Sequence, residues 1–124
     1  MNGAQRVFVY GTLRRHGNHH HLLGKARFLG DYVTPPGYTM VDLGDYPAVV
    51  AGGRYQVTGE VYRITQRVLA RLDEYEDYPR EYTRRKIATA YGPSWIYLRV
   101  RPGIVSGYTR RLVKTGNWLA GRQG

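Results

Sequence analysis

Glycine and proline divide this chain into short segments, and that division constrains the fold more than any other feature of the sequence. The 124 residues include 16 Gly and 6 Pro, and the segments between them are rich in Val, Ile, Tyr and Thr. Segments of this composition, bounded by turn residues, are typical of β-strands. Because a chain of this length is one domain of ordinary size, we expect a single β-rich domain spanning residues 1–124.

The predicted strands differ in how they are buried. The segment Arg6–Leu13 (RVFVYGTL) contains four consecutive apolar residues, so we expect a strand that is buried on both faces and broken at Gly11. Three segments alternate apolar and polar residues, which predicts one solvent-exposed face for each: Gln56–Ile64, Tyr82–Tyr91 and Trp95–Arg101. Shorter strands are predicted at Ala26–Val33, Tyr38–Leu43 and Ala48–Val50.

One segment, Thr65–Glu76, has the pattern of an α-helix. Thr65 is a suitable N-cap residue, and the helix is expected to end before Pro79. A weaker pattern at Leu13–Leu23 predicts a further helical turn or two. One helix among six or more short strands favours an α+β fold, in which a small mixed β-barrel, closed or half-closed, carries one main helix on its outside.

A helical wheel places Glu76 within the apolar stripe of the predicted helix. With Val68 at zero and about 100° per residue, Leu72 lies at about 40°, Glu76 at about 80° and Leu69 at about 100°. A carboxylate that is buried without partners loses several kcal/mol of hydration energy or has a raised pKa. The wheel therefore makes Glu76 a candidate functional carboxylate.

Two interpretations of Glu76 stay open at this stage. In the functional one, the side chain faces the core, and its pKa is raised by desolvation first and by the nearby charges of Asp73 and Asp77 second. In the structural one, the end of the helix frays and Glu76 turns outward to pair with Arg80 or Arg84. Five of the nine acidic residues of the chain lie within this short stretch.

A second candidate site follows the first predicted strand, at Tyr10, Gly11, Thr12 and Leu13. A glycine directly after a buried strand lets the backbone turn so that successive N–H groups face one way. Such a turn forms a small site for an anion or a carbonyl oxygen. An ordinary turn at the end of a strand has the same sequence pattern and is the alternative.

Several kinds of chemistry are excluded or disfavoured. The chain has no Cys, which excludes disulfides, thiolate nucleophiles and metal sites built on sulfur. Of its four histidines, only His16 and His20 have a spacing that shares a helical face, so surface histidines are favoured over a metal site. Neither serine lies in a Gly-x-Ser-x-Gly motif, and no Gly-rich phosphate loop is present. We therefore expect no metal site.

The chain is strongly basic. It has 19 Lys and Arg residues against 9 Asp and Glu residues, which gives a net charge of +10. No acidic residue follows Glu81, whereas nine basic residues do. Because the basic residues occur as scattered pairs, solvated strand faces are favoured over nucleic-acid binding.

No apolar run approaches the length of a membrane helix, and the start of the chain has no apolar stretch of the kind found in signal peptides. We expect a cytoplasmic protein without a membrane partner.

Two motifs about sixty residues apart together resemble signatures of the γ-glutamylcyclotransferase-like superfamily. The first is VFVYGTLRRHGNHHHLL, in which a strand leads into Tyr-Gly-(Thr/Ser)-Leu. The second is GEVYRITQRVLARLDEYEDYPREYTRR, in which Gly-Glu-Val-Tyr precedes a helix and then Tyr-x-Arg. With Tyr46-Pro47-Ala48 between them, the similarity extends to about Trp118. The form Leu-Asp-x-(aromatic)-Glu-x-x-Pro-x-x-Tyr-x-Arg is similar to γ-glutamylamine cyclotransferases and their bacterial relatives.

The resemblance implies a γ-glutamylcyclotransferase-like fold and an enzyme that acts on a small γ-glutamyl substrate. In that family the α-amine of the substrate attacks its own γ-carbonyl, releasing 5-oxoproline and a free amine without a cofactor. The catalytic glutamate corresponds to Glu76, and a tyrosine that lines the site corresponds to Tyr82. The substrate loop corresponds to Tyr10, Gly11, Thr12 and Leu13. An inactive or differently acting family member and a basic β-barrel module for an anionic partner are the alternatives.

Overall fold

The computed structural model describes residues 4–100 and 111–119 of the chain. Its largest element is a five-stranded mixed sheet with the strand order β2-β5-β1-β7-β6. The central strand, β1, is antiparallel to β5 and parallel to β7. The strands of this sheet are β1 (Gln5–Val9), β2 (Arg27–Val33), β5 (Thr58–Ile64), β6 (Tyr82–Ile87) and β7 (Ser94–Arg99).

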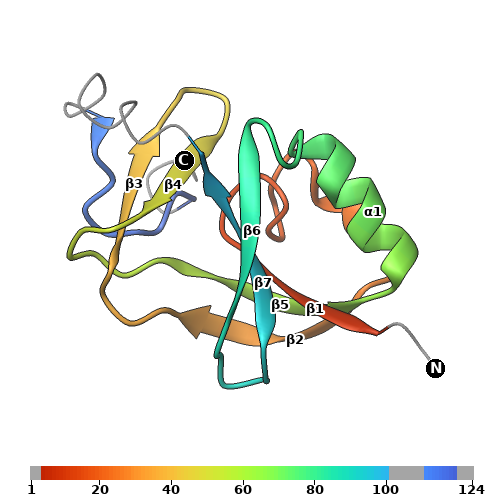
Figure 1. Cartoon of the computed structure of the whole chain (residues 1–124). Helices are drawn as coiled ribbons and strands as arrows, with labels where there is room; N and C mark the ends of the chain where they lie inside the picture. Colours follow the sequence, from red (N-terminus) through yellow and green to blue (C-terminus); the bar gives the residue numbers. More distant parts are fainter. Residues whose placement is uncertain (1–3, 101–110, 120–124) are drawn as a thin grey trace.

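An α-helix and a hairpin cover the two faces of this sheet. The helix is α1 (Gln66–Tyr75), and the hairpin consists of β3 (Tyr38–Asp42) and β4 (Pro47–Ala51). A short 3-10 helix, η1 (His20–Leu23), lies where a weak helical pattern was predicted. Figure 1 shows α1 and the hairpin on opposite sides of the sheet.

Successive residues of β1 contribute to two different hydrophobic clusters, because side chains alternate across a strand. Val7 and Val9 belong to a helix-side core, whereas Phe8 and Tyr10 belong to a hairpin-side core. The helix-side core consists of Val7, Val9, Leu13, Leu23, Tyr62, Ile64, Leu69, Leu72, Tyr82 and Tyr97. The hairpin-side core consists of Phe8, Tyr10, Met40, Val49, Val57, Val61, Ile96, Leu98, Trp118 and Leu119.

The predicted strand positions are confirmed, but the predicted barrel is wrong. Each of the seven predicted strands corresponds to a strand of the structure, with Arg101 of the last prediction lying outside the described residues. The main sheet is open, because β2 and β6 form its two edges and pair only with β5 and β7, respectively. Strands β3 and β4 pair with each other in a separate two-stranded sheet.

The exposed faces predicted for two of the alternating strands are also wrong. In β5 only Arg63 is exposed, and β7 has no exposed residue. Both strands lie between the two cores, so their polar residues other than Arg63 are buried or half-buried. Gly59 in β5 shows how closely the strands pack, because a Cβ at this position would overlap the carbonyl oxygen of Val9 in β1.

The position of α1 is set at its N-terminus by Thr65. This residue has an extended backbone, and its side chain accepts a hydrogen bond of 3.1 Å from the backbone N–H of Val68. This is the geometry of an N-cap, as predicted from the sequence. Leu69 and Leu72 then bury the apolar face of the helix against the sheet. In the described part of the chain, no helix has the length and apolar character needed to cross a bilayer.

We expect Thr65→Ala to lower the free energy of unfolding by about 1 kcal/mol, because it removes the acceptor that caps α1. Chemical denaturation followed by circular dichroism measures this change. Thr65→Ser keeps the hydroxyl and serves as the control, with an expected change below about 0.5 kcal/mol. Equal destabilisation by both variants would show that the methyl group of Thr65, and not the cap, stabilises the helix.

Candidate active site

The end of β1, the start of β4, the end of α1 and the strands β6 and β7 surround a cavity of about 350 Å³. All six residues singled out from the sequence line it, namely Tyr10, Gly11, Thr12, Leu13, Glu76 and Tyr82. The first four and Glu76 are more than sixty residues apart in the chain. The sheet contributes to this arrangement because β1 lies next to β7, and Tyr97 and Arg99 of β7 line the same cavity.

The end of α1 fixes the backbone of Glu76. The N–H of Tyr78 donates to the carbonyl of Asp73, and the N–H of Asp77 donates to the carbonyl of Glu74. These two bonds, with Asp77 at a φ of 54°, form a Schellman motif that terminates the helix. Asp tolerates this left-handed conformation better than most residues. The helix end is therefore ordered by its own hydrogen bonds, and Glu76 is its C-cap residue.

Glu76 does not turn outward to pair with an arginine. Arg80 binds Asp77 at 2.9 Å, and Arg84 forms a two-pronged ion pair with Asp73 at 2.7 and 2.9 Å. The structural interpretation left open by the sequence is therefore wrong. Within the described residues, the carboxylate of Glu76 has neither an ion-pair partner nor a hydrogen-bond donor.

Burial raises the pKa of Glu76 from 4.5 to about 8, and the positive charge of Arg99 opposes this rise. Desolvation is thus the leading cause, as predicted, whereas the expected contribution of Asp73 and Asp77 is absent among the causes. Those two carboxylates are neutralised by Arg84 and Arg80.

Tyrosine hydroxyls form much of the cavity wall. Burial raises the pKa values of Tyr10, Tyr75, Tyr82 and Tyr97, and the charge of Glu76 adds to the rise in each. All four rings therefore stay neutral near pH 7. Three of these hydroxyls donate to protein acceptors: Tyr10 to the carbonyl of Tyr97, Tyr82 to the carbonyl of Pro47 and Tyr97 to the carboxylate of Asp73.

The loop after β1 lines the cavity with backbone as well as side chains. In residues 4–100 and 111–119, the N–H groups of Gly11, Thr12 and Leu13 donate no hydrogen bond to a protein acceptor. The hydroxyl of Thr12 is hydrogen bonded to that of Tyr75 at 2.9 Å, which ties the loop to the end of α1. A Cβ on Gly11 would lie 2.8 Å from Cδ of Pro47, so this position leaves room for glycine alone.

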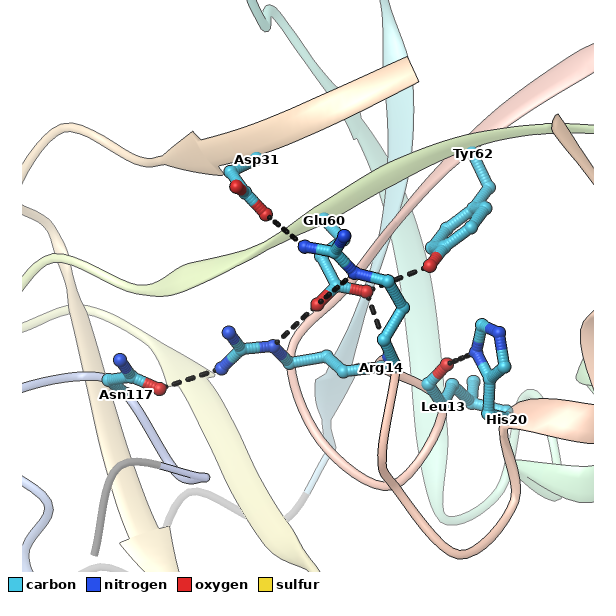
Figure 2. A network of polar contacts seen from close by, with 8 residues as sticks. Leu13, Arg14, His20, Asp31, Glu60, Tyr62 and Asn117 are labelled. Carbon is cyan, nitrogen blue, oxygen red and sulfur yellow. Dashed lines mark hydrogen bonds and ion pairs between the residues drawn. The ribbon is translucent and has the colours of Figure 1, made fainter. Parts of the chain in front are cut away.

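A buried carboxylate, Glu60 in β5, holds the next part of this loop in place (Figure 2). Glu60 is only 2% exposed. Its Oε1 accepts hydrogen bonds of 2.9 Å from the backbone N–H of Arg15 and from the hydroxyl of Tyr62. Its Oε2 lies 3.3 Å from Nε of Arg14 and 3.5 Å from Nε of Arg15. Arg14 also donates to Asn117 at 2.7 Å, which links the loop to the C-terminal segment.

Sequence reasoning missed two charged residues of this region. Glu60 belongs to the Gly-Glu-Val-Tyr motif recognised in the sequence. Its role as an anchor, however, depends on Arg15 and Arg14, which lie 45 and 46 positions away in the chain. Arg99 lines the cavity and pairs with Glu81 at 2.7 Å. The alternation of polar residues in their strands indicated solvent exposure, and no other signal in the sequence marked either residue as part of the site.

The histidines lie beside the loop and not in a cluster. His16 and His21 are exposed, whereas His19 and His20 are half-buried. Nδ1 of His20 lies 2.8 Å from the carbonyl oxygen of Leu13, and the ring of His19 lies 5.0 Å from that of Tyr75. No group of three potential metal ligands occurs among the residues that the structure describes.

We expect Glu60→Gln to lower the free energy of unfolding by about 3 to 5 kcal/mol, because it leaves the largely buried side chain of Arg14, which is 12% exposed, without its counter-charge. Asp31→Asn is the matched control, since it also removes a carboxylate partner of Arg15 but at an exposed site. Its expected cost is below about 1 kcal/mol. Urea denaturation of both variants measures the difference, and similar costs would contradict an anchoring role for Glu60.

We expect the titration of Glu76 to reduce stability as pH rises from about 4.5 to about 8. In this range the folded protein keeps the proton that the unfolded chain has lost, so unfolding becomes easier with each added pH unit. Below and above the range both states carry the same charge at this residue. Glu76→Gln removes the titrating group and should flatten this part of the profile, and an unchanged profile would contradict the raised pKa.

Comparisons with known proteins show which family this chain belongs to. The family described as "Gamma-glutamyl cyclotransferase, AIG2-like" matches residues 7–120. The Escherichia coli K12 protein named gamma-glutamylcyclotransferase family protein YtfP is 41% identical over 114 residues, which cover 92% of this chain and 96% of that protein. The gamma-glutamylaminecyclotransferase of Bos taurus is 32% identical over 118 residues, covering 74% of this chain and 70% of the bovine protein.

Among solved structures, the solution NMR structure of ytfP from Escherichia coli superposes with a TM-score of 0.74 at 40% sequence identity. The superposition covers 96% of this chain and all of that one. The residues that the family matches include the loop after β1 and the helix α1. The chain therefore belongs to the gamma-glutamyl cyclotransferase, AIG2-like family.

Proposed function

We propose that this protein is a γ-glutamyl cyclotransferase that converts a small γ-glutamyl amine or γ-glutamyl dipeptide into 5-oxoproline and a free amine. One observation carries the proposal: Glu76, whose carboxylate has no partner among the residues that the structure describes, shares a cavity with the loop after β1. Three consecutive N–H groups of that loop have no acceptor within the same described residues. A base and a set of hydrogen-bond donors are the two kinds of group that an acyl transfer needs.

The substrate supplies the nucleophile, so the protein has to fold the substrate and move protons. Glu76 accepts a proton from the α-ammonium group, and the freed amine attacks the γ-carbonyl carbon to form the C–N bond of a five-membered ring. Because both reacting groups belong to one molecule, proximity lowers the barrier. A pKa of about 8 places Glu76 close to neutral pH, where a group that accepts and later donates a proton works best.

The tetrahedral intermediate then collapses with release of the amine. The negative charge on the former carbonyl oxygen is stabilised by N–H groups of Gly11, Thr12 and Leu13. As the original γ-amide bond breaks, the ring nitrogen gives up a second proton and the leaving nitrogen takes up both, each relayed by Glu76. The ring nitrogen keeps one hydrogen, the amine leaves as an ammonium ion, and Glu76 returns to its starting state.

The cavity suits a small, charged substrate. Its volume of about 350 Å³ is near the lower end of the range for ligand pockets. Neutral tyrosine hydroxyls around Glu76 supply polar contacts without adding charge, and Arg99 in the wall provides a positive charge for the α-carboxylate of the substrate. The similarity to the bovine gamma-glutamylaminecyclotransferase supports γ-glutamyl amines as the first compounds to test.

The acidic wall disfavours a polyanion as the ligand of this cavity. Glu76 lines it without an ion-pair partner among the described residues, and its ionised form would repel phosphate groups. Asp77 and Glu81 also line it, but each is paired with an arginine. A protein of this family without cyclotransferase activity is the remaining alternative, and only turnover measurements distinguish it from an active enzyme.

We expect Glu76→Gln to lower 5-oxoproline formation by about two to four orders of magnitude, because it removes the base while keeping the size of the side chain. Substrate affinity should change little. The measurement is turnover of a panel of γ-glutamyl amines and dipeptides, followed by chromatographic detection of 5-oxoproline. If the wild type is active and the Glu76→Gln variant keeps full activity, Glu76 is not part of the mechanism.

Gly11→Ala provides the contrast in the same assay. Its Cβ would press against Pro47, which forms part of the cavity wall and accepts the hydrogen bond of Tyr82. This variant should therefore weaken substrate affinity more than it lowers the turnover of bound substrate. Absence of 5-oxoproline from every compound tested with the wild type would favour a family member without this activity.

A further inference from the structure

The tyrosines that line the cavity around Glu76 fall into a buried set and an exposed set. Tyr10, Tyr82 and Tyr97 are buried, and their hydroxyls donate to protein acceptors. Tyr46 and Tyr75 line the same cavity, but they are 41% and 37% exposed. Exposed side chains that line a cavity mark the part of it that opens to solvent. Tyr46 and Tyr75 therefore lie at the mouth of the cavity.

The two exposed tyrosines come from different parts of the chain. Tyr46 directly precedes β4, and Tyr75 is the last residue of α1. The hydroxyl of Tyr75 is hydrogen bonded to that of Thr12 at 2.9 Å, and its ring lies 5.0 Å from the ring of His19. Burial raises the pKa values of Tyr75 and Tyr82, and Tyr46 lies close enough to both hydroxyls to add to the rise. The side chain of Tyr46 is thus directed toward the other tyrosines of the cavity.

No basic side chain covers these two rings, in contrast to the other exposed aromatic residues. The structure describes four aromatic residues among its exposed large hydrophobic side chains: Phe28, Tyr46, Tyr75 and Tyr78. Guanidinium groups lie 4.3 Å from the ring centre of Phe28 and 4.6 Å from that of Tyr78. In the described part of the chain, no Lys or Arg takes this position over Tyr46 or Tyr75. The two exposed rings without a cation are the two that line the cavity.

The charges of the cavity limit what else a ligand can carry. Among the described residues that line it, Arg99 is the only basic one, and it is paired with Glu81 at 2.7 Å. Asp77 is paired with Arg80, which does not line the cavity. The proposed function assigns Arg99 to the α-carboxylate of the substrate. A second carboxylate, on the leaving amine, would have no further basic partner among these residues, and ionised Glu76 would repel it.

A γ-glutamyl amide meets the inner part and the mouth of the cavity with different parts of its structure. The glutamyl part has to reach Glu76 and the N–H groups of the loop after β1, because the ring closes there. The substituent on the leaving nitrogen takes no part in ring closure and extends toward the mouth. Aromatic rings attract each other in offset or edge-to-face arrangements, in addition to the gain from burying apolar surface. An aromatic substituent is therefore well suited to Tyr46 and Tyr75.

We propose that Tyr46 and Tyr75 bind the leaving amine of the substrate, and that they select γ-glutamyl amides in which this amine carries an aromatic ring and no carboxylate. This inference rests on the proposed cyclotransferase function and names the substrate class within it. Tyr46 and Tyr75 determine specificity by contacting the substituent, whereas Glu76 and the loop after β1 contact the reacting atoms.

Three compounds test the proposal on the full wild-type chain. They are γ-glutamyl-phenethylamine, γ-glutamyl-ethylamine, which lacks the ring, and γ-glutamyl-phenylalanine, which adds a carboxylate to the first compound. Release of 5-oxoproline gives kcat and KM for each. We expect kcat/KM for γ-glutamyl-phenethylamine to exceed that for each of the other two by about tenfold, mainly through a lower KM.

Variants of Tyr46 distinguish a contact with the substrate from a structural role. Tyr46→Ala should lower kcat/KM about fivefold for γ-glutamyl-phenethylamine and less than about twofold for γ-glutamyl-ethylamine. Tyr46→Phe keeps the ring and should change neither value by more than about twofold. Phe28→Ala is the matched control, because Phe28 is 40% exposed and does not line the cavity. Equal losses on both compounds in Tyr46→Ala would overturn the proposal.

Tyr75 allows the same comparison through the ratio of the two kcat/KM values. Tyr75→Phe loses the hydrogen bond to Thr12 but keeps the ring, so the preference for γ-glutamyl-phenethylamine should persist even if both compounds react more slowly. Tyr75→Leu removes the ring and should reduce this preference about threefold or more. An unchanged preference in Tyr75→Leu would remove Tyr75 from the proposed site.

The outcomes separate this inference from the function on which it rests. Equal kcat/KM for all three compounds would keep the cyclotransferase activity and overturn the aromatic site. Equal values for the phenethylamine and phenylalanine compounds would overturn the exclusion of a carboxylate. If no compound releases 5-oxoproline, the proposed function fails, and calorimetric titration tests the site by itself. Tighter binding of γ-glutamyl-phenethylamine than of γ-glutamyl-ethylamine would then support the aromatic site, and equal or absent binding would overturn it.

Discussion

The buried carboxylate of Glu60 is the interaction on which the arrangement of this molecule depends most. A charge removed from water is costly unless several partners surround it. Here two arginine side chains, one backbone N–H and one tyrosine hydroxyl do so. These partners come from the loop after β1 and from β5 itself, and Arg14 extends the network to Asn117 near the end of the described chain. One side chain thus fixes a loop, a strand and the C-terminal segment relative to each other.

Glu60 and Glu76 show how the surroundings of a glutamate decide its chemistry. Glu60 is buried and Glu76 is half-buried in the cavity wall, but donors surround the first, whereas the second has none among the described residues. The partners of Glu60 hold it in one position. Without partners, the carboxylate of Glu76 is destabilised by burial and stays available for a proton. The loop that Glu60 anchors lines the same cavity as Glu76.

Local features of the sequence predicted the elements well, and features that depend on tertiary structure were missed. The position of Glu76 followed from helical periodicity, since its neighbours Leu69 and Leu72 had to face the core. The prediction of a barrel was wrong because short strands of similar length do not reveal whether the two edges of a sheet meet. The burial of Glu60 was missed because alternation shows which residues share a face, but not whether another layer covers that face. Here the sheet has a core on both sides.

The parallel pairing of β1 with β7 has a consequence for how the protein forms during synthesis. β1 lies near the start of the chain, yet its neighbours in the sheet are β5 and β7, and the hydroxyl of Tyr10 reaches the carbonyl of Tyr97, 87 positions away. Contacts between such distant positions slow folding. The apolar residues of β1 have to wait for late strands, and an unpaired strand edge is a site of aggregation. Because residues of β7 line the cavity, the site cannot be complete until synthesis has passed β7.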